Sequence, residues 1–263
     1  MDKQGFLSTI PGLEEIFVVF SLATKMPYVS CHKDTFDDYI MVYLVADEAS
    51  AKIKELVEEK IPCSGVKIAK KSILAFLSEL RATGVNAILF RKGEEEYFVQ
   101  LTEILKFPDE SDKANKPIEN AELHLSMIYM MQEVRKDIPK EEKKNLAELE
   151  EETSANISKA RFLLPVQETE GEVNGEDKGI NRAVMLLKND KEQVFIPLFT
   201  DIPEIRKFTK GKEVKMITAD FKGVIKLLSN GTPEGVVINP GSSSVMVSKE
   251  GIVAIARNFL TNK

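Results

Sequence analysis

The chain has 263 residues, enough for one large domain or two small ones at roughly 100–200 residues each. Hydrophobic residues make up 43% and charged residues 30%, the balance of an ordinary globular protein. A net charge of −6 and a pI near 5.3, with Lys and Arg spread along the chain, disfavour a nucleic-acid-binding face. No run approaches the ~18–20 apolar residues of a membrane span, and the N-terminus lacks a secretory signal pattern. We therefore expect a cytoplasmic protein without a membrane segment.

The first elements in chain order are a predicted leading helix and a set of short strands. Leu13, Ile16, Phe17 and Phe20 share one face at helical spacing, which predicts the helix. Asp47 follows an apolar run, where a carboxylate can accept the unpaired amides of a first helical turn. The apolar runs that we expect to form strands are 28–31, 40–46, 66–69, 87–90 and 97–101.

A helix is predicted next over residues 71–82, and a polar stretch with two prolines, 106–117, is typical of a linker. Two further helices are expected, one over 123–138 and an acidic, lysine-rich one from Pro139 to about residue 159. The first carries an apolar stripe formed by Leu123, Met127, Met130, Met131, Val134 and Ile138. Such a stripe fits either a core, here the seam between two domains, or a partner surface, and we favour the core.

The second half alternates strands and helices in a similar way. Asp201 stands before a short helix with Glu204 three residues on, which is a capping-box pattern. A helix is predicted over 219–229, and residues 168–179, rich in Glu, Gly and Asn, are expected to be disordered or flap-like. The predicted strands are 162–166, 182–187, 193–199, 214–217, 236–239 and 245–247.

The two halves show signs of an internal repeat. The apolar face Ile73, Phe76, Leu77 and Leu80 recurs as Phe221, Val224, Ile225 and Leu228, a constant shift of 221 − 73 = 148 positions. Each helix then reaches a Gly-containing turn and a short strand-like run. We predict an α/β protein with α+β-like layers, made of two tandem copies of a small mixed-sheet domain. The copies span 1–105 and 153–263, joined by a helical linker over 106–152, and pack as a pseudo-dimer.

Residues with catalytic or metal-binding chemistry are sparse. The two histidines, His32 and His124, and the two cysteines, Cys31 and Cys63, match no closed metal-site spacing. A Cys–His nucleophile pair that uses His124 remains open but has no support, and we expect the cysteines to stay reduced. No phosphate or dinucleotide loop occurs, so we predict no metal and no cofactor.

The loop over residues 239–244 (NPGSSS) is the most polar, backbone-exposing stretch at a predicted strand end. Its amides and hydroxyls could bind an anion, but Asn, Pro and Gly also dominate ordinary hairpin turns, which is the interpretation we favour. The charged run 140–152 is typical of a solvated helix face, with a scaffold role for it as a weaker hypothesis.

Three segments of the second half resemble a known family. Residues 162–166 (FLLPV), 194–201 (VFIPLFTD) and 235–242 (GVVINPGS) resemble the N-terminal domain of the SseB family. Its pattern has a strand that ends in Pro, a P-x-F-T strand end before a helix, and a strand that ends in Asn-Pro. The resemblance covers most of 156–255, and it implies no established catalytic activity. The first half departs from these motifs, so it is identified as a degenerate copy.

Two functions follow as hypotheses. The first is a non-enzymatic binding or adaptor protein, a monomer or homodimer with protein partners and no nucleic acid or membrane. The second is a small-ligand or enzymatic site in the second copy, which requires the FTD and NPGS motifs to converge in space. Alternatively, the same residues serve only packing, helix entry and a turn. The candidate binding residues are Pro197, Phe199, Thr200, Asp201, Asn239, Pro240, Gly241 and Ser242; no catalytic residue is predicted.

Overall fold

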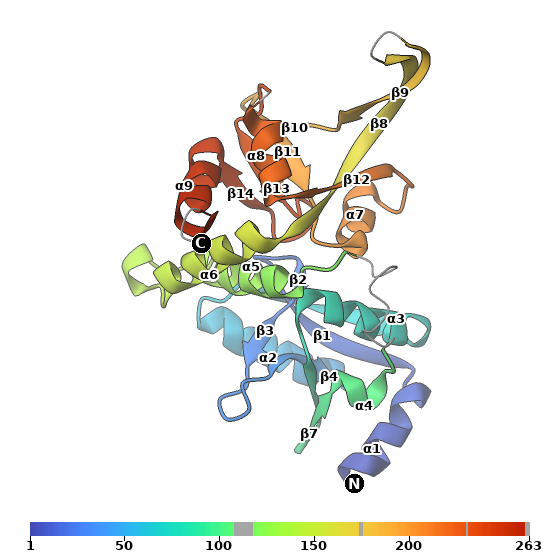
Figure 1. Ribbon diagram of the computed structural model, residues 1–263. Coiled ribbons are helices and arrows are strands. Elements are labelled where there is room, and N and C mark those ends of the chain that lie inside the picture. The colour runs from blue at the N-terminus through green and yellow to red at the C-terminus, as the bar shows by residue number, and fades with distance from the viewer. Residues whose placement is uncertain (108–117, 174–175, 230, 261–263) are drawn as a thin grey trace. The chain divides into compact units, whose positions relative to one another are not determined.

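The computed structural model describes residues 1–107, 118–173, 176–229 and 231–260, with the side chains of 169–181 left aside (Figure 1). The described chain divides into two compact units. Unit 1 consists of Met1–Lys116 and His124–Leu149, and unit 2 consists of Pro117–Leu123 and Glu150–Lys263. Both units combine helices with mixed sheets, so the predicted α/β class is confirmed. The predicted linker over 106–117 lies almost entirely outside the described residues.

Unit 1 is built on one mixed sheet. Its strands are β1 (Glu15–Ser21), β2 (Met26–Pro27), β3 (Val29–Cys31), β4 (Asp38–Tyr43), β5 (Cys63–Ala69), β6 (Ala87–Lys92) and β7 (Glu95–Gln100). The central strand β1 pairs antiparallel with β5, β4 and β2, while β4 runs parallel to β6 and β6 antiparallel to β7. The short strand β3 pairs antiparallel with β4.

Helices α1 (Lys3–Thr9), α2 (Ala46–Glu58), α3 (Lys70–Leu80), α4 (Leu101–Ile104) and α5 (Ala121–Val134) accompany this sheet. One hydrophobic cluster joins Phe6 of α1, Leu77 of α3 and Ile128 of α5 to the sheet. A second cluster places Leu56 of α2 with Val19 of β1. The sheet is therefore covered by apolar side chains on both faces.

The predicted leading helix over residues 13–20 is wrong, because this segment forms strand β1. Its neighbouring residues Val18 and Val19 are both fully buried, one in each of the two clusters. A strand buried on both faces has a nearly continuous apolar run, which satisfies helical spacing by chance. Asp47 is also not the cap of α2, since that helix begins at Ala46 with Val45 at the capping position.

Unit 2 contains the strands β8 (Arg161–Val173), β9 (Glu176–Val184), β10 (Leu187–Lys188), β11 (Val194–Leu198), β12 (Lys215–Asp220), β13 (Gly235–Ile238) and β14 (Val245–Ser248). They form one sheet in the order β10-β11-β13-β14 and another in the order β12-β8-β9. An antiparallel bridge between Leu163 and Phe199 connects the two sheets. Strands β11 and β13 are parallel, and the other pairs are antiparallel.

The helices of unit 2 are α7 (Ile202–Thr209), α8 (Phe221–Ser229) and α9 (Lys249–Leu260). The predicted apolar face of α8 is confirmed, with Phe221, Val224 and Leu228 buried. Helix α6 (Leu146–Lys159) leads into β8 and is preceded by a short 3-10 turn, Lys140–Glu142. The single helix that was expected from Pro139 onward is therefore interrupted.

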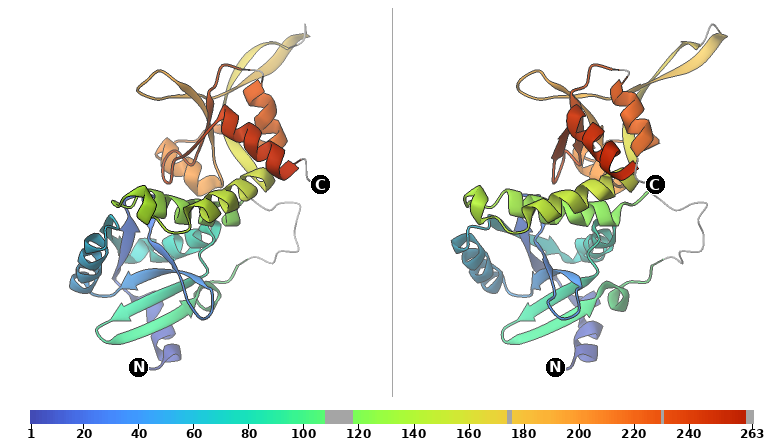
Figure 2. Two further views of the ribbon diagram at one scale, coloured as in Figure 1. Left: turned by 90° about the vertical axis from the view of Figure 1, so that its left-hand side faces the viewer. Right: turned by 60° about the vertical axis from the view of Figure 1, so that its left-hand side comes forward.

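The stretch 168–179 was expected to be disordered or flap-like. Apart from residues 174–175, which lie outside the described residues, it belongs to the long strands β8 and β9. These strands pair antiparallel over most of their length and extend beyond the remainder of unit 2 as a narrow ribbon (Figure 2). The Glu, Gly and Asn content suggested disorder because these residues are poor strand formers. The pairing of β8 with β9 makes this stretch a strand, and local composition does not reveal such pairing.

The two units follow the same order of strand pairing. In unit 1 the order is β5-β1-β4-β6-β7, and in unit 2 it is β12-β8-β11-β13-β14 when the Leu163–Phe199 bridge is included. In both, the only parallel pair within this order joins the third strand to the fourth, β4 to β6 and β11 to β13. This agreement supports the prediction of tandem copies.

Candidate functional site

The FTD and NPGS motifs converge because they follow two neighbouring parallel strands. β11 ends at Leu198 and β13 at Ile238, and these two residues are paired in the sheet. Parallel strands place their carboxyl ends at the same edge of a sheet. The residues after them, Thr200 and Asn239, therefore meet, as the ligand-site hypothesis required.

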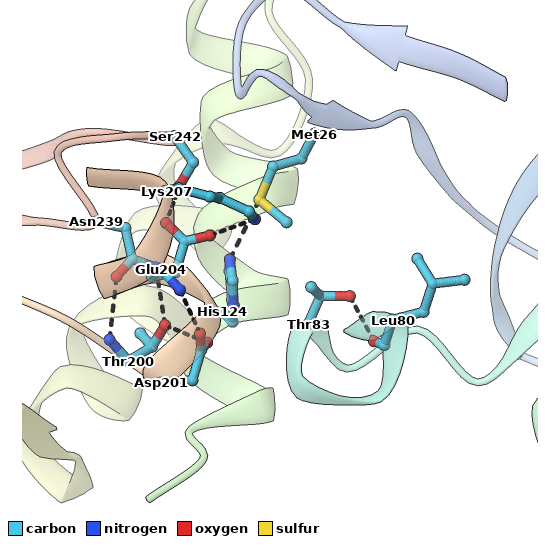
Figure 3. Close-up of polar contacts among 10 residues, drawn as sticks. All are labelled: Met26, Leu80, Thr83, His124, Thr200, Asp201, Glu204, Lys207, Asn239 and Ser242. Carbon is cyan, nitrogen blue, oxygen red and sulfur yellow. Dashed lines mark hydrogen bonds and ion pairs between the residues drawn. The ribbon is translucent and has the colours of Figure 1, made fainter. Parts of the chain in front are cut away.

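Thr200 and Asn239 are joined by two side-chain hydrogen bonds (Figure 3). The backbone N–H of Thr200 donates to Asn239 Oδ1 at 3.0 Å, and Asn239 Nδ2 donates to Thr200 Oγ1 at 2.8 Å. The Thr200 hydroxyl in turn donates to Asp201 Oδ2 at 2.8 Å. All three side chains are buried, so the two loops are tied together away from solvent.

Asp201 caps α7, as its position in the sequence predicts. Its Oδ1 accepts a hydrogen bond from the Glu204 N–H at 2.9 Å. The Glu204 side chain, 0% exposed, accepts a hydrogen bond from the Ser242 hydroxyl and forms an ion pair with Lys207 Nζ at 2.7 Å. A buried carboxylate needs such partners, because desolvation of an unpaired charge is costly. Thus α7 is fixed at its first turn to the NPGS loop.

The remaining candidate residues surround this cluster. Pro197 lies within β11 opposite Val237, and Phe199 is fully buried with its ring centroid 5.3 Å from that of Phe208. Asn239 has a left-handed backbone with φ of +50°, and Pro240 is half-buried. A Cβ on Gly241 would lie 3.2 Å from the Phe208 backbone nitrogen, so a glycine suits this close approach.

The Ser242–Ser244 segment completes a hairpin between β13 and β14, the interpretation that the turn composition favoured. Backbone N–H groups of Ser242 and Ser244 both donate to the Asn239 carbonyl at 3.0 Å. The hydroxyl of Ser243 is buried, and within the described chain it has no hydrogen-bond partner. The loop is therefore folded inward onto the cluster.

Asn120, which sequence reasoning missed, ties a third segment to the same place. Its Nδ2 donates to the carbonyls of Thr200 at 2.7 Å and Arg161 at 2.8 Å, and its Oδ1 accepts from the Arg161 N–H at 3.1 Å. The sequence gives no indication that Asn120 joins these segments, because its hydrogen-bond partners are distant in the sequence.

A groove also missed from the sequence lies between α7 and β12. Its volume is about 650 Å³. It is lined by Ile202, Ile205, Arg206, Thr209 and the segment 211–216. The cluster fixes the first turn of α7, so the motif residues determine where one wall of the groove stands.

The histidines and cysteines of unit 1 lie in different surroundings. His124 on α5 is buried, with Nε2 3.3 Å from the Met26 sulfur, whereas His32 lies in the turn after β3. Both cysteines are free thiols, Cys31 exposed and Cys63 buried, and burial raises the pKa of the Cys63 thiol to about 11. Among the described residues, no group of three or more His, Cys, Asp or Glu side chains is placed to hold a metal ion.

The apolar stripe predicted over 123–138 lies on α5, which ends at Val134. Leu123, Met127 and Ile128 are buried, and Ile128 packs in the main cluster of unit 1. The burial favours the core interpretation of the methionine stripe. None of the helices that the structure describes is both long and apolar enough to cross a membrane.

Comparison with known families agrees with the sequence resemblance. Residues 142–254 match the family model described as the SseB protein N-terminal domain. The matched residues lie in the second half of the chain and contain the cluster and the groove. The first half lies outside this match, so its identification as a degenerate copy remains a prediction.

Among solved structures, the chain is similar to Anabaena Tic22, described as a protein of protein transport, with 13% identity, 88% of each chain covered and a TM-score of 0.23. It is also similar to Tic22 from Plasmodium falciparum, with 9% identity, 83% of this chain and 84% of that chain covered, and a TM-score of 0.22. No curated protein matches the chain.

Proposed function

We propose that this chain is a non-enzymatic binding or adaptor protein, and that unit 2 binds a protein segment in the groove between α7 and β12. The groove itself, with a volume of about 650 Å³, is the observation that carries the proposal. Binding sites are typically concave, with an apolar lining and a few polar groups that fix orientation. Ile202, Ile205 and Val214 supply the apolar part of this lining.

The charges around the groove favour an acidic partner segment. Arg206, Lys212 and Lys215 line it and are exposed, with Glu213 as the acidic residue among the lining. None of the three cations forms an ion pair with another described residue. On a chain of net charge −6, these cations form a local positive edge that attracts an acidic segment.

The candidate binding residues support this function indirectly. Thr200, Asp201, Glu204, Asn239 and Ser242 are buried and bond to one another, so they act as positioning residues that hold α7 beside the groove. Pro197, Phe199, Pro240 and Gly241 pack around them. Mutual bonding in a buried cluster favours this role over direct contact with a small ligand or a reaction at these groups.

The proposal includes two tandem copies of one α/β unit. The common order of strand pairing in the two units supports it. Its pseudo-dimeric packing, the cytoplasmic location and a monomeric or homodimeric state stay predictions.

A random-peptide display library tests the binding function without a known partner. We expect the full chain to select peptides that combine Asp or Glu with apolar residues. Charge reversal of the groove by Arg206→Glu with Lys215→Glu should abolish their binding. The matched control is Lys222→Glu with Lys226→Glu, because both residues are exposed on α8 and lie outside the groove lining. Failure to select any peptide, or equal binding by both double variants, would refute the proposal.

A further inference from the structure

Strand β12 forms the outer wall of the groove and is an edge strand. Within the described chain it pairs only with β8, from Lys215 opposite Val166 to Asp220 opposite Arg161. Its other side presents backbone N–H and C=O groups without a neighbouring strand. Such an edge is a ready template for another extended chain.

The pairing on the far side of β8 shows which groups of β12 point outward. Leu163 exchanges backbone hydrogen bonds with Phe199, at 2.9 and 3.0 Å, so its N–H and C=O point away from β12. Residues along an antiparallel strand alternate in direction. Leu163 is opposite Thr218 and Pro165 is opposite Met216. The backbone groups of Met216 and Thr218 therefore face the open edge.

Pro165 agrees with this alternation. Proline has no N–H to donate, and it occupies a position where the ladder to β12 requires none. Its carbonyl accepts from the Met185 N–H at 2.9 Å, on the side away from β12. The β8–β12 ladder is thus complete without the backbone groups of Met216 and Thr218.

The corresponding place in unit 1 is filled by the chain itself. There α2, with 13 residues, packs Leu56 and Ile53 against Cys63 of strand β5. A Cβ on Gly65 of β5 would lie 3.1 Å from Ile53 Cδ1. In unit 2 the helix α7, which follows β11 as α2 follows β4, has only 8 residues, and the groove lies between it and β12.

We propose that an extended acidic peptide of a partner protein binds by adding a strand to the open edge of β12. This inference rests on the proposed function and specifies its binding mode. Met216 and Thr218 supply the backbone hydrogen bonds, and every second peptide side chain enters the apolar groove beside Ile202 and Ile205. Acidic residues of the peptide lie near Arg206, Lys212 and Lys215. Backbone pairing supplies affinity in this mode, while the groove and its charges select the sequence.

Backbone methylation of a selected peptide tests the mode directly. Only alternate amides of an added strand face β12, so N-methylation at successive positions should weaken binding about tenfold or more at every second residue and little between them. A scrambled peptide of the same composition should bind poorly. Uniform sensitivity to methylation, or equal binding of the scrambled peptide, would overturn strand addition and leave groove binding in place.

A variant of β12 tests the same mode from the protein side. Thr218→Pro removes an N–H that faces the open edge, which an edge strand tolerates, whereas Thr218→Val keeps it. We expect the proline variant to lose about tenfold in affinity for the selected peptide, and the valine variant to bind as the wild type. Circular dichroism must show both variants folded; should the proline variant unfold, the methylation series decides. Unchanged binding by a folded proline variant would contradict the proposal.

Discussion

Replacing Asn239 with alanine removes both side-chain hydrogen bonds that join the β13–β14 loop to the β11–α7 turn. A buried hydrogen bond contributes about 1 kcal/mol, and a buried donor left without a partner, here the Thr200 N–H, costs about 1–3 kcal/mol. Asn239 also has φ of +50°, where alanine costs about 1–2 kcal/mol. Because these contributions overlap, we expect the free energy of unfolding of unit 2 to fall by about 3–5 kcal/mol.

Urea titration followed by circular dichroism measures this loss, and hydrogen exchange over β11 and α7 locates it in the structure. Asn239→Gly is the matched control. Glycine also removes the side-chain bonds but accepts the left-handed backbone, so its loss should be about 1 kcal/mol smaller. A loss below about 1 kcal/mol for the alanine variant would show that Asn239 does not hold the two loops together.

Three further predictions concern single positions. Lys210 follows the last residue of α7 and has φ of +53°. Its replacement by glycine should raise the free energy of unfolding, measured by urea titration, by about 0.5–1 kcal/mol. A lower free energy of unfolding would contradict the left-handed cap. Gly235→Ala should destabilise unit 2 by about 1–3 kcal/mol or more, because the new Cβ would lie 2.3 Å from a backbone oxygen of β14; a neutral result would reject this close approach. Burial raises the pKa of Cys63 to about 11, so the stability contributed by the neutral thiol is complete below about pH 8.5 and falls as pH rises through about 11. Urea titrations across this range should show a smaller fall for Cys63→Ala, and in thiol labelling of the native protein Cys31 should react well before Cys63.

The structure differs from the sequence-based predictions where tertiary packing overrides the local residue pattern. Residues 13–20 have helical spacing but form β1, because the strand is apolar on both faces. The composition of 168–179 suggested disorder, yet pairing between β8 and β9 makes most of it strand. In both cases a partner distant in sequence decides the local structure, and no window of neighbouring residues contains that partner.

Features that depend on neighbouring residues could be predicted from the amino-acid sequence alone. Asp201 caps α7, the spacing of Phe221, Val224 and Leu228 gives α8 its buried face, and the motifs around Thr200 and Asn239 indicated the SseB domain. Capping, helical spacing and strand ends depend on residues that are close together in the sequence, so the sequence predicts them. Only the tertiary structure joined Thr200 to Asn239 and Asn120, and only it opened the groove between α7 and β12. The two hydrogen-bonded contacts join residues 39 and 80 positions apart, and the groove depends on where sheet pairing places β12 beside α7.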